Sequence, residues 1–376
     1  MPNIFECSIA SRTFSLQVEK FALQASGAVA VHYANTVVLV TACVKPEPRE
    51  GIDFLPLTVD YEEKLYAAGK IPGSFFRREG RPTEEAIITS RLIDRSLRPL
   101  FPKGFYRDVQ VVATVLSADQ ENDPDICALI GASAALTLSD IPFFGPISAM
   151  HVGYINGNLV LNPSLPQMEN SLLDVVVAST EQAVVMVEVG AKEASEELIL
   201  EAIKLGHEAN QKIIELQERL RRNYGKPKME IEVGEVNPEL LTVISSILED
   251  KLDQALEQHE KPEREQALAS VRKEVMESLA DKFPEVEISS AFESQLRAAV
   301  RKKILPKGQH LDGRQAKEIR PISSEVGLLP RSHGSGLFIR GQTQVLTIAT
   351  LGSLGKEQLL DSIGIEETKR FMHHYN

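Results

Sequence analysis

Residues 75 to 81 bring together side chains that could bind a polyanion. The stretch consists of Phe75-Phe76-Arg77-Arg78-Glu79-Gly80-Arg81. Guanidinium groups match the geometry of phosphate oxygens, and two adjacent aromatic rings can stack on unpaired bases. The pattern therefore indicates sequence-independent contact with a single-stranded nucleic acid. The alternative is a surface loop whose aromatic rings fold back into the core.

Positive charge is concentrated around this stretch. The chain has a formal net charge of −12, whereas residues 75–107 contain seven Arg, one Lys and four acidic residues, a balance of +4. The other residues therefore carry −16. A positive island on an acidic protein binds a polyanion at one place while the remaining surface repels it. Broad electrostatic adhesion to nucleic acid is excluded, so any contact must be local.

A helix is predicted directly after the stretch, over residues 83–97. Thr83 can cap its N-terminus, and Glu84 and Glu85 suit the positive end of the helix dipole. Pro99 then ends the helix. The face toward a sheet would be apolar through Ala86, Ile93 and Leu97.

Three arginines of this helix are candidates for supporting phosphate contacts. Arg91, Arg95 and Arg98 fall at i, i+4 and i+7, so they share one face. Asp94 lies on the same face, within reach of Arg91 and Arg98. An ion-pair network is therefore the favoured interpretation of these arginines, and phosphate contacts are the alternative.

The residues around this helix predict an α+β domain covering residues 1–230. Alternating and β-branched segments predict strands, and apolar residues at helical spacing predict helices. The predicted strands lie in residues 14–45, 54–61, 109–116, 151–154, 159–162, 173–178 and 184–189. Two further helices are predicted, a buried one over residues 126–138 and an amphipathic one over residues 195–222.

An all-helical domain is predicted over residues 231–306, after a linker at residues 225–238. Five apolar residues repeat every four positions: Leu240, Ile244, Leu248, Leu252 and Leu256. A second periodic segment lies between residues 267 and 305. Both segments are rich in Glu, Lys and Arg, which we interpret as a solvent-exposed outer face.

Residues 307–376 return to a strand pattern and repeat part of the first domain. Residues 27–43 align with residues 334–350 without a gap, at an offset of 307. The repeat predicts that a second copy of the first fold begins here. Residues 371–376 would correspond to the strand at residues 54–61, so we expect the second copy to be incomplete.

Composition excludes other classes of protein. Cys7, Cys43 and Cys127 are too few and too far apart for a disulfide framework or a thiolate metal site, which fits a reducing compartment. The longest nearly apolar segment, residues 126–138, is shorter than the roughly 20 residues that span a bilayer. Residues 1–14 lack the apolar core of a signal peptide. We therefore expect a cytoplasmic protein with no membrane partner.

Three motifs resemble the bacterial polynucleotide phosphorylase family. They are SFFRREGRPT at residues 74–83, RLIDRSLRPLF at residues 91–101 and GLLPRSHGSG at residues 327–336. The resemblance covers the whole chain in the family's order. It implies an RNase PH-type domain, an all-helical domain and the start of a second RNase PH-type domain.

The resemblance implies a function as well as a fold. Members of this family are homotrimeric rings that degrade single-stranded RNA from its 3′ end in mRNA turnover. Inorganic phosphate is the nucleophile, nucleoside diphosphates are released, and Mg²⁺ helps to offset charge on the phosphoryl oxygens. Partners in an RNA-degradation complex are implied too. The resemblance assigns RNA binding to Phe75, Phe76, Arg77, Arg78 and Arg81.

The resemblance places the active centre, with its Mg²⁺, in the part of the second RNase PH-type domain that would follow Asn376. In the first domain, the family's Asp, Asp and Lys correspond to Met168, Asp174 and Val176, so two of the three groups are absent. The phosphate loop corresponds to residues 117–125, where four carboxylates would repel phosphate. We therefore predict no catalytic and no metal-ligating residue in this chain, and expect no phosphorolysis by it alone.

Other interpretations are weaker. Residues 119–125 lack the glycine and the terminal Glu of an EF-hand loop, which disfavours metal binding. His373 and His374 are adjacent, so on a strand they would point to opposite faces. His333 is interpreted as part of a turn, since no nucleophile elbow accompanies it. The alternative function is that of a non-catalytic RNA-binding or trimer-scaffold protein.

Overall fold

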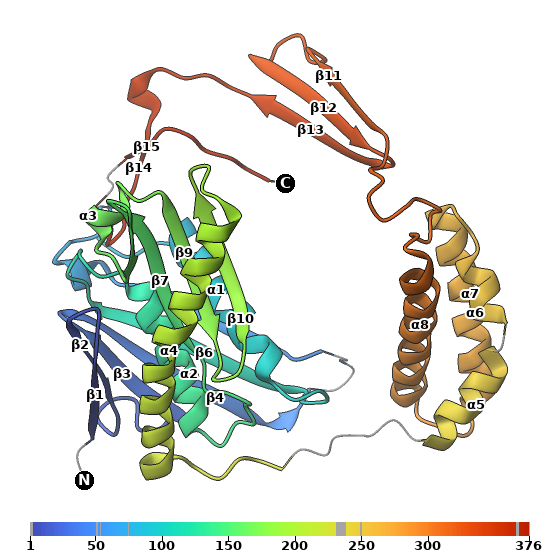
Figure 1. The fold of residues 1–376 in the computed structure, drawn as a ribbon, viewed down its shortest axis with the longest axis horizontal. Coiled ribbons are helices and arrows are strands. Elements are labelled where there is room, and N and C mark those ends of the chain that lie inside the picture. Colours follow the sequence, from blue (N-terminus) through green and yellow to red (C-terminus); the bar gives the residue numbers. More distant parts are fainter. Residues whose placement is uncertain are drawn as a thin grey trace. The chain divides into compact units, whose positions relative to one another are not determined.

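The computed structural model describes residues 3–49, 52, 54–73, 75–230, 238–248, 250–365 and 368–375. The chain divides into two units (Figure 1). The first unit contains Met1–Val233 and Glu357–Asn376, and the second contains Gly234–Lys356. Mixed α+β structure in the first unit confirms the predicted fold class. The domain boundaries expected at residues 231 and 307 stay a prediction.

The first unit contains a six-stranded sheet in the order β1-β2-β3-β4-β6-β5. Neighbouring strands are antiparallel, except that β5 and β6 are parallel. The strands are β1 (Ile4–Ile9), β2 (Arg12–Gln17), β3 (Gly27–Tyr33), β4 (Thr36–Pro48), β5 (Leu57–Glu63) and β6 (Arg107–Ser117). The strand expected at residues 54–61 begins only after Pro56, which has no amide hydrogen for the ladder.

Helix α2 (Pro124–Leu138) covers one face of this sheet and packs on β3 and β4. Every residue of α2 except Asp125 is buried, which confirms the buried helix predicted at residues 126–138. A Cβ atom added to Gly131 would lie 2.5 Å from Val40 Cγ2 and 2.8 Å from Val31 Cγ2. The missing side chain at Gly131 therefore allows the helix to approach the sheet closely.

A second, four-stranded sheet has the order β10-β9-β7-β8 and is antiparallel throughout. Its elements are β7 (Ser148–Ile155), β8 (Asn158–Leu161), the short helix α3 (Leu165–Met168), β9 (Leu173–Ser179) and β10 (Val184–Ala191). The long helix α4 (Glu196–Tyr224) packs on β7 and β9. Buried Asn210 of α4 donates hydrogen bonds to the Val177 carbonyl at 3.0 Å and to Ser179 Oγ at 2.9 Å.

Helix α1 (Glu84–Leu97) packs on β5 and begins where the sequence predicts. Thr83 Oγ1 accepts a hydrogen bond from the Ala86 amide at 3.0 Å, as expected of an N-cap. The predicted apolar face is buried at Ala86, Ile93 and Leu97. A 3₁₀-helix, η1 (Leu65–Ala68), precedes residues 75–81, here called the arginine-rich loop, and another, η2 (Arg98–Leu100), follows α1.

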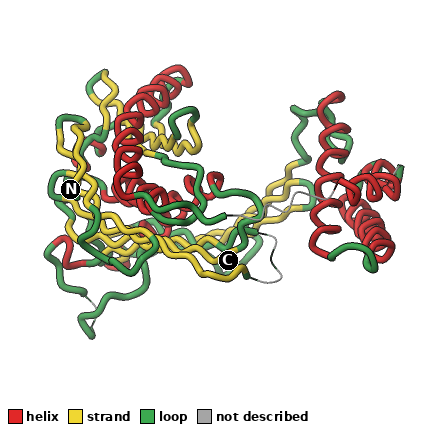
Figure 2. The backbone as a smooth tube through the Cα atoms, turned by 90° about the horizontal axis from the view of Figure 1, so that it is seen from below, coloured by secondary structure: helices red, strands yellow, loops and turns green. Residues whose placement is uncertain are grey.

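The second unit contains four helices among its described residues (Figure 2). They are α5 (Pro238–Leu248), α6 (Lys251–Leu256), α7 (Lys261–Leu279) and α8 (Glu285–Lys307). The five residues predicted at a spacing of four are all buried. Pro262 stands in the first turn of α7 and Pro284 at the N-cap of α8, where no intrahelical amide donor is needed. The expected linker falls partly on residues 231–237, which lie outside the described residues.

A three-stranded antiparallel sheet of β11 (Ile322–Val326), β12 (Gly334–Arg340) and β13 (Thr343–Ala349) also belongs to the second unit. Gly334 pairs with Ala349 across the β12–β13 hairpin. Gly27 pairs with Ala42 across the β3–β4 hairpin. The two pairs are related by the offset of 307, so the repeat has the same register in both copies.

The end of the chain returns to the first unit. Strands β14 (Gln358–Leu359) and β15 (Thr368–Lys369) pair with each other. Residues 371–375, which follow them, form no strand. The strand expected at residues 371–376 is therefore wrong for the described residues, because a strand needs a partner for its backbone groups and no ladder forms there.

Candidate nucleic-acid interface

The return arm of the arginine-rich loop is fixed to the elements beside it. Glu79 accepts a hydrogen bond from the Leu65 amide at 2.9 Å and pairs with Lys64 Nζ at 3.3 Å. Thr83 Oγ1 donates to Glu63 Oε2 at 3.1 Å. These contacts attach the loop to β5 and η1, so its tip projects from a defined base.

Phe75 and Phe76 form the exposed tip of the loop. Phe75 is 92% exposed and Phe76 is 78% exposed. Their ring centroids lie 5.3 Å apart, with the planes at 85°. The alternative in which the rings fold into the core is therefore wrong. Large apolar side chains exposed together indicate a contact surface rather than a structural role.

Three exposed arginines, Arg77, Arg78 and Arg81, accompany the aromatic pair. Arg77 has a φ angle of 52°, in the left-handed region that costs a non-glycine residue about 1–2 kcal/mol. Its Nη1 donates to the Pro72 carbonyl at 3.3 Å, across the base of the loop. The loop therefore presents cationic groups and aromatic rings side by side, as a single-strand binding surface requires.

The arginines of α1 make contacts within the protein. Arg98 donates to both carboxylate oxygens of Asp94, at 2.6 and 2.9 Å. Arg95 pairs instead with Glu188 of β10. Ion pairs therefore hold Arg95 and Arg98, although only one of them uses the expected partner. For Arg91, Arg95 and Arg98, supporting phosphate contacts stay a prediction.

The acidic segment at residues 119–125 is organised by Asp119. Its Oδ1 accepts hydrogen bonds from the amides of Glu121 at 3.0 Å and Asn122 at 2.8 Å. Burial alone would raise the pKa of Asp119, but the hydrogen bonds from Asn122 hold it below its usual value. A phosphate-binding loop offers such amides to the anion. Here the Asp119 carboxylate already accepts the hydrogen bonds of the Glu121 and Asn122 amides.

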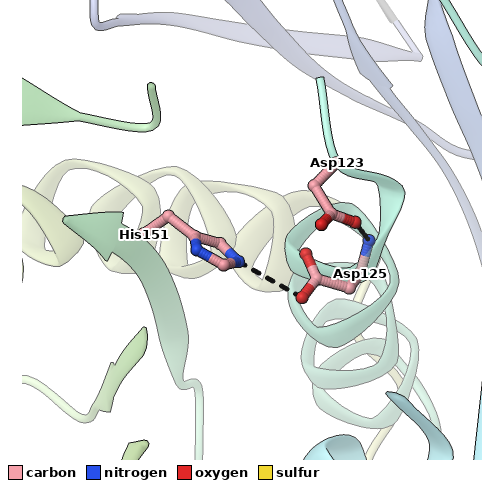
Figure 3. Close-up of side chains that lie close together, drawn as sticks. All are labelled: Asp123, Asp125 and His151. Atoms are coloured by element: carbon pink, nitrogen blue, oxygen red, sulfur yellow. Dashed lines mark hydrogen bonds and ion pairs between the residues drawn. The ribbon is translucent and has the colours of Figure 1, made fainter. Parts of the chain in front are cut away.

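Asp123, Asp125 and His151 meet beside this segment (Figure 3). His151 Nε2 lies 3.3 Å from Asp125 Oδ2, and His151 Nδ1 lies 3.2 Å from Asp174 Oδ1. Asp123 at the N-cap of α2, Asp125 in its first turn, His151 of β7 and Asp174 of β9 thus form one cluster. Sequence reasoning singled out the aspartates but missed His151, because nothing in the sequence shows that β7 runs beside the start of α2.

The environment of the cluster shifts the pKa of each group. Burial and the neighbouring Asp125 carboxylate raise the pKa of Asp123 to about 7. Burial opposes the charge of His151, yet the Asp125 carboxylate and hydrogen bonds to Asp125 and Asp174 raise the pKa of His151 well above its usual value. Burial likewise would raise the pKa of Asp125, but His151 holds it below its usual value. A carboxylate at each ring nitrogen and the raised pKa therefore favour the imidazolium form of His151.

A cavity of about 110 Å³ adjoins the cluster. Its wall is mostly apolar, through residues that include Phe14, Ile126, Ile130 and Ile213. Its polar end carries Asp123, His151 and Asp174. The carboxylates disfavour an anion such as phosphate at this end of the cavity.

Comparison with known families and proteins supports the resemblance of the three motifs. Residues 10–142 and 145–209 match domains 1 and 2 of the 3′ exoribonuclease family, and residues 239–315 match the polyribonucleotide nucleotidyltransferase RNA binding domain. Polyribonucleotide nucleotidyltransferase of Heliobacterium modesticaldum is 53% identical over 376 residues, 100% of this chain and 53% of the relative. That of Roseiflexus sp. is 53% identical over 375 residues, covering 98% of this chain and 50% of the relative. The chain belongs to the polyribonucleotide nucleotidyltransferase family.

Within this family, the chain spans about half the length of the curated relatives that it matches. The RNase PH-type assignment of residues 10–209 and the helical assignment of residues 239–315 follow the order that the motifs imply. Among solved structures, rice (Oryza sativa) Rrp46 has a TM-score of 0.46 and 16% identity, covering 55% of this chain and 93% of its own. Among the described residues, no helix combines the length and apolar character that a membrane crossing requires.

The family implies a divalent metal, and the Asp123, Asp125 and His151 cluster is the place in the described residues where one would be sought. The cluster does not fit Mg²⁺. Both ring nitrogens of His151 face carboxylates, and an imidazolium has no lone pair for a metal. Mg²⁺ also prefers oxygen ligands in an octahedral arrangement. The positive charge of His151 therefore stands where a cation would otherwise balance the aspartates.

Proposed function

We propose that this chain is part of a phosphate-dependent 3′-to-5′ exoribonuclease and that its own contribution is to hold single-stranded RNA. The whole enzyme would use inorganic phosphate to release nucleoside diphosphates, act in mRNA turnover in the cytoplasm, work as a homotrimer and join RNA-degradation partners. Family membership supports this proposal. The observation that carries the RNA-binding role is the exposed pair Phe75 and Phe76 beside Arg77, Arg78 and Arg81.

The loop would grip RNA without reading its sequence. Every base has a π face that can stack on Phe75 or Phe76, at about 1–3 kcal/mol per base. The guanidinium groups of Arg77, Arg78 and Arg81 would contact the phosphates between those bases. This combination lets successive nucleotides pass over one site, as a processive exonuclease needs.

We further propose that the catalytic centre and its Mg²⁺ lie in the portion of the relatives that this chain does not cover. Met168 and Val176 stand where the family's carboxylate and lysine would be. The amides near Asp119 are engaged by its carboxylate, and the His151 cluster does not fit the metal. These three features support a first domain that guides RNA and does not cleave it.

The test compares two loop variants by fluorescence anisotropy with a labelled oligo(A) across a range of salt. Arg77→Glu with Arg78→Glu should weaken binding at least tenfold at low salt and lower the salt slope by about 1.4, about 0.7 for each lost phosphate contact. Phe75→Ala with Phe76→Ala should cost about 1–3 kcal/mol per lost stack, with the salt slope unchanged.

A matched control carries the same charge change elsewhere in the first unit. Arg221→Glu with Arg222→Glu, at the exposed end of α4, should leave binding within about twofold of the parent chain. If both arginine pairs cause the same loss of RNA affinity, the loss comes from the overall electrostatic field of the protein and not from contacts of the loop. The parent chain should release no nucleoside diphosphate from poly(A) with phosphate and Mg²⁺. Robust release would overturn the placement of the catalytic centre.

A further inference from the structure

The end of the chain contacts the outgoing arm of the arginine-rich loop. Asp361 Oδ2 accepts a hydrogen bond from the Gly73 amide at 2.7 Å, although the two residues are 288 positions apart in the sequence. A Cβ atom at position 73 would lie only 3.3 Å from the same oxygen. Gly73 therefore permits the close approach of a carboxylate at the point where the loop leaves the body of the first unit.

The same segment is anchored in the first unit by three neighbouring contacts. Lys70 Nζ donates to the carbonyl oxygens of Ser362 at 3.0 Å and Gly364 at 2.8 Å. The Ile363 side chain is 5% exposed and belongs to the main core of the first unit. Gln120 Nε2 donates to the Ile363 carbonyl at 3.3 Å. A buried side chain with several hydrogen bonds gives the segment a defined position.

The segment also reaches the other end of the loop. Lys369 forms an ion pair with Glu84 in the first turn of α1, directly after the loop. A hydrogen bond from Lys369 lowers the pKa of Glu84. Pairing between β14 and β15 places Gln358 opposite Lys369, which closes the segment on itself. Asp361 and Lys369 therefore act on the two ends of the loop from one closed element.

We propose that residues 361–365 and 368–369, here called the clasp segment, position the arginine-rich loop for RNA, with Asp361 and Lys369 as the positioning residues. The inference rests on the proposed function of the loop. Ordering a free loop residue costs backbone conformational entropy, so fixing both ends of the loop in advance reduces the entropic cost of binding RNA. By linkage, bound RNA would in turn stabilise the clasp segment.

The clasp segment links the two copies of the repeat. It follows β13 in the chain, so it leaves the repeated hairpin and docks on the domain that carries the loop.

The experiment uses the 376-residue chain and two substitutions at one position. Asp361→Ala removes the acceptor for the Gly73 amide, whereas Asp361→Asn removes the same charge and keeps an oxygen acceptor. Hydrogen exchange at residues 70–73 should become about tenfold faster in Asp361→Ala and stay within about twofold in Asp361→Asn. Affinity for labelled oligo(A) should fall about threefold in Asp361→Ala only.

The direction of the affinity change separates positioning from charge. Loss of a negative charge near a phosphate-binding loop would by itself strengthen RNA binding, equally in both variants. Positioning predicts weaker binding in Asp361→Ala alone. At the other end of the loop, Lys369→Glu should weaken binding, and adding Glu84→Lys should restore it toward that of the parent chain.

Two results would overturn the inference. Unchanged exchange at Gly73 in Asp361→Ala would show that the clasp does not fix the loop. Faster exchange with unchanged RNA affinity would show that the fixed loop does not matter for binding. Failure of the proposed function would give a different result: Arg77→Glu with Arg78→Glu would leave RNA affinity unchanged. Hydrogen exchange at Gly73 in Asp361→Ala would still decide whether the clasp segment fixes the loop.

Discussion

The β3–β4 and β12–β13 hairpins share a sequence pattern and a register, but they differ in burial. Val38 is fully buried in the first, and its counterpart Val345 is 44% exposed in the second. Helix α2 packs on β3 and β4, whereas β13 is exposed along its length in the described residues. Register is therefore a local property of the hairpin, and burial depends on the element that covers it.

The two hairpins should differ most in how much stability they lose when their first glycine, Gly27 or Gly334, is replaced by alanine. A Cβ atom on Gly27 would lie 2.1 Å from the Ala135 carbonyl oxygen of α2, whereas one on Gly334 would meet only Ala349 Cβ at 3.5 Å. Gly27→Ala should lower the free energy of unfolding of the first unit by about 3 kcal/mol, because backbone must move. Gly334→Ala should change that of the second unit by less than about 0.5 kcal/mol. Hydrogen exchange of each hairpin during urea unfolding measures both, and equal costs would contradict the comparison.

A smaller difference is expected at the matched valines. Val38→Ala should cost about 2 kcal/mol, through lost burial and the cavity left against its neighbours. Val345→Ala should cost less than about 0.5 kcal/mol, because its side chain is already partly in water. The same exchange measurement reports both values. A large cost at Val345 would show that β12–β13 is covered in solution.

The smallest expected effect on stability concerns the buried His151, which lies beside the start of α2 in the first unit. The folded pKa of His151 is raised above the value of about 6.5 expected when unfolded. Its stabilising contribution is therefore complete below about pH 6.5 and is lost as pH rises through the folded pKa. His151→Gln should cost about 1.5 kcal/mol at pH 6 and progressively less at alkaline pH.

His333 provides the matched control for this effect in the second unit. It accepts a hydrogen bond from the Leu351 amide at 2.9 Å in an exposed setting. Urea unfolding of His333→Gln should show a cost below about 0.5 kcal/mol, because the ring is exposed. A pH-independent cost for His151→Gln would mean that the His151 ring is neutral in the folded chain.

Much of the fold could be predicted because its signals are local. The cap at Thr83, the apolar face of α1 and the continuous burial of α2 all depend on neighbours within a few turns. The exposed tip at Phe75 and Phe76 was one of two open alternatives, since a sequence does not show whether an aromatic ring finds a pocket. Residues 371–375 were misjudged because a strand depends on a partner that its own sequence does not specify.

The residues of the candidate site could be predicted from the sequence, but the contacts that hold them in place could not. The loop motif identified Phe75 to Arg81, whereas the contact of Asp361 with Gly73 joins residues 288 positions apart. Arg95 similarly bonds to Glu188, 93 positions away, a partner that the sequence did not indicate. His151 belongs to the aspartate cluster because β7 runs beside the start of α2, which the sequence does not show.

Sequence alone was enough to predict the helices, the cap at Thr83, the composition of the loop and the repeat of residues 27–43 at residues 334–350. These depend on backbone preferences and side-chain periodicity over short separations. Packing between distant segments settles which hairpin is buried, that both ring nitrogens of His151 face aspartates, and that Asp361 contacts Gly73. Such outcomes depend on packing between distant segments, which no local pattern encodes.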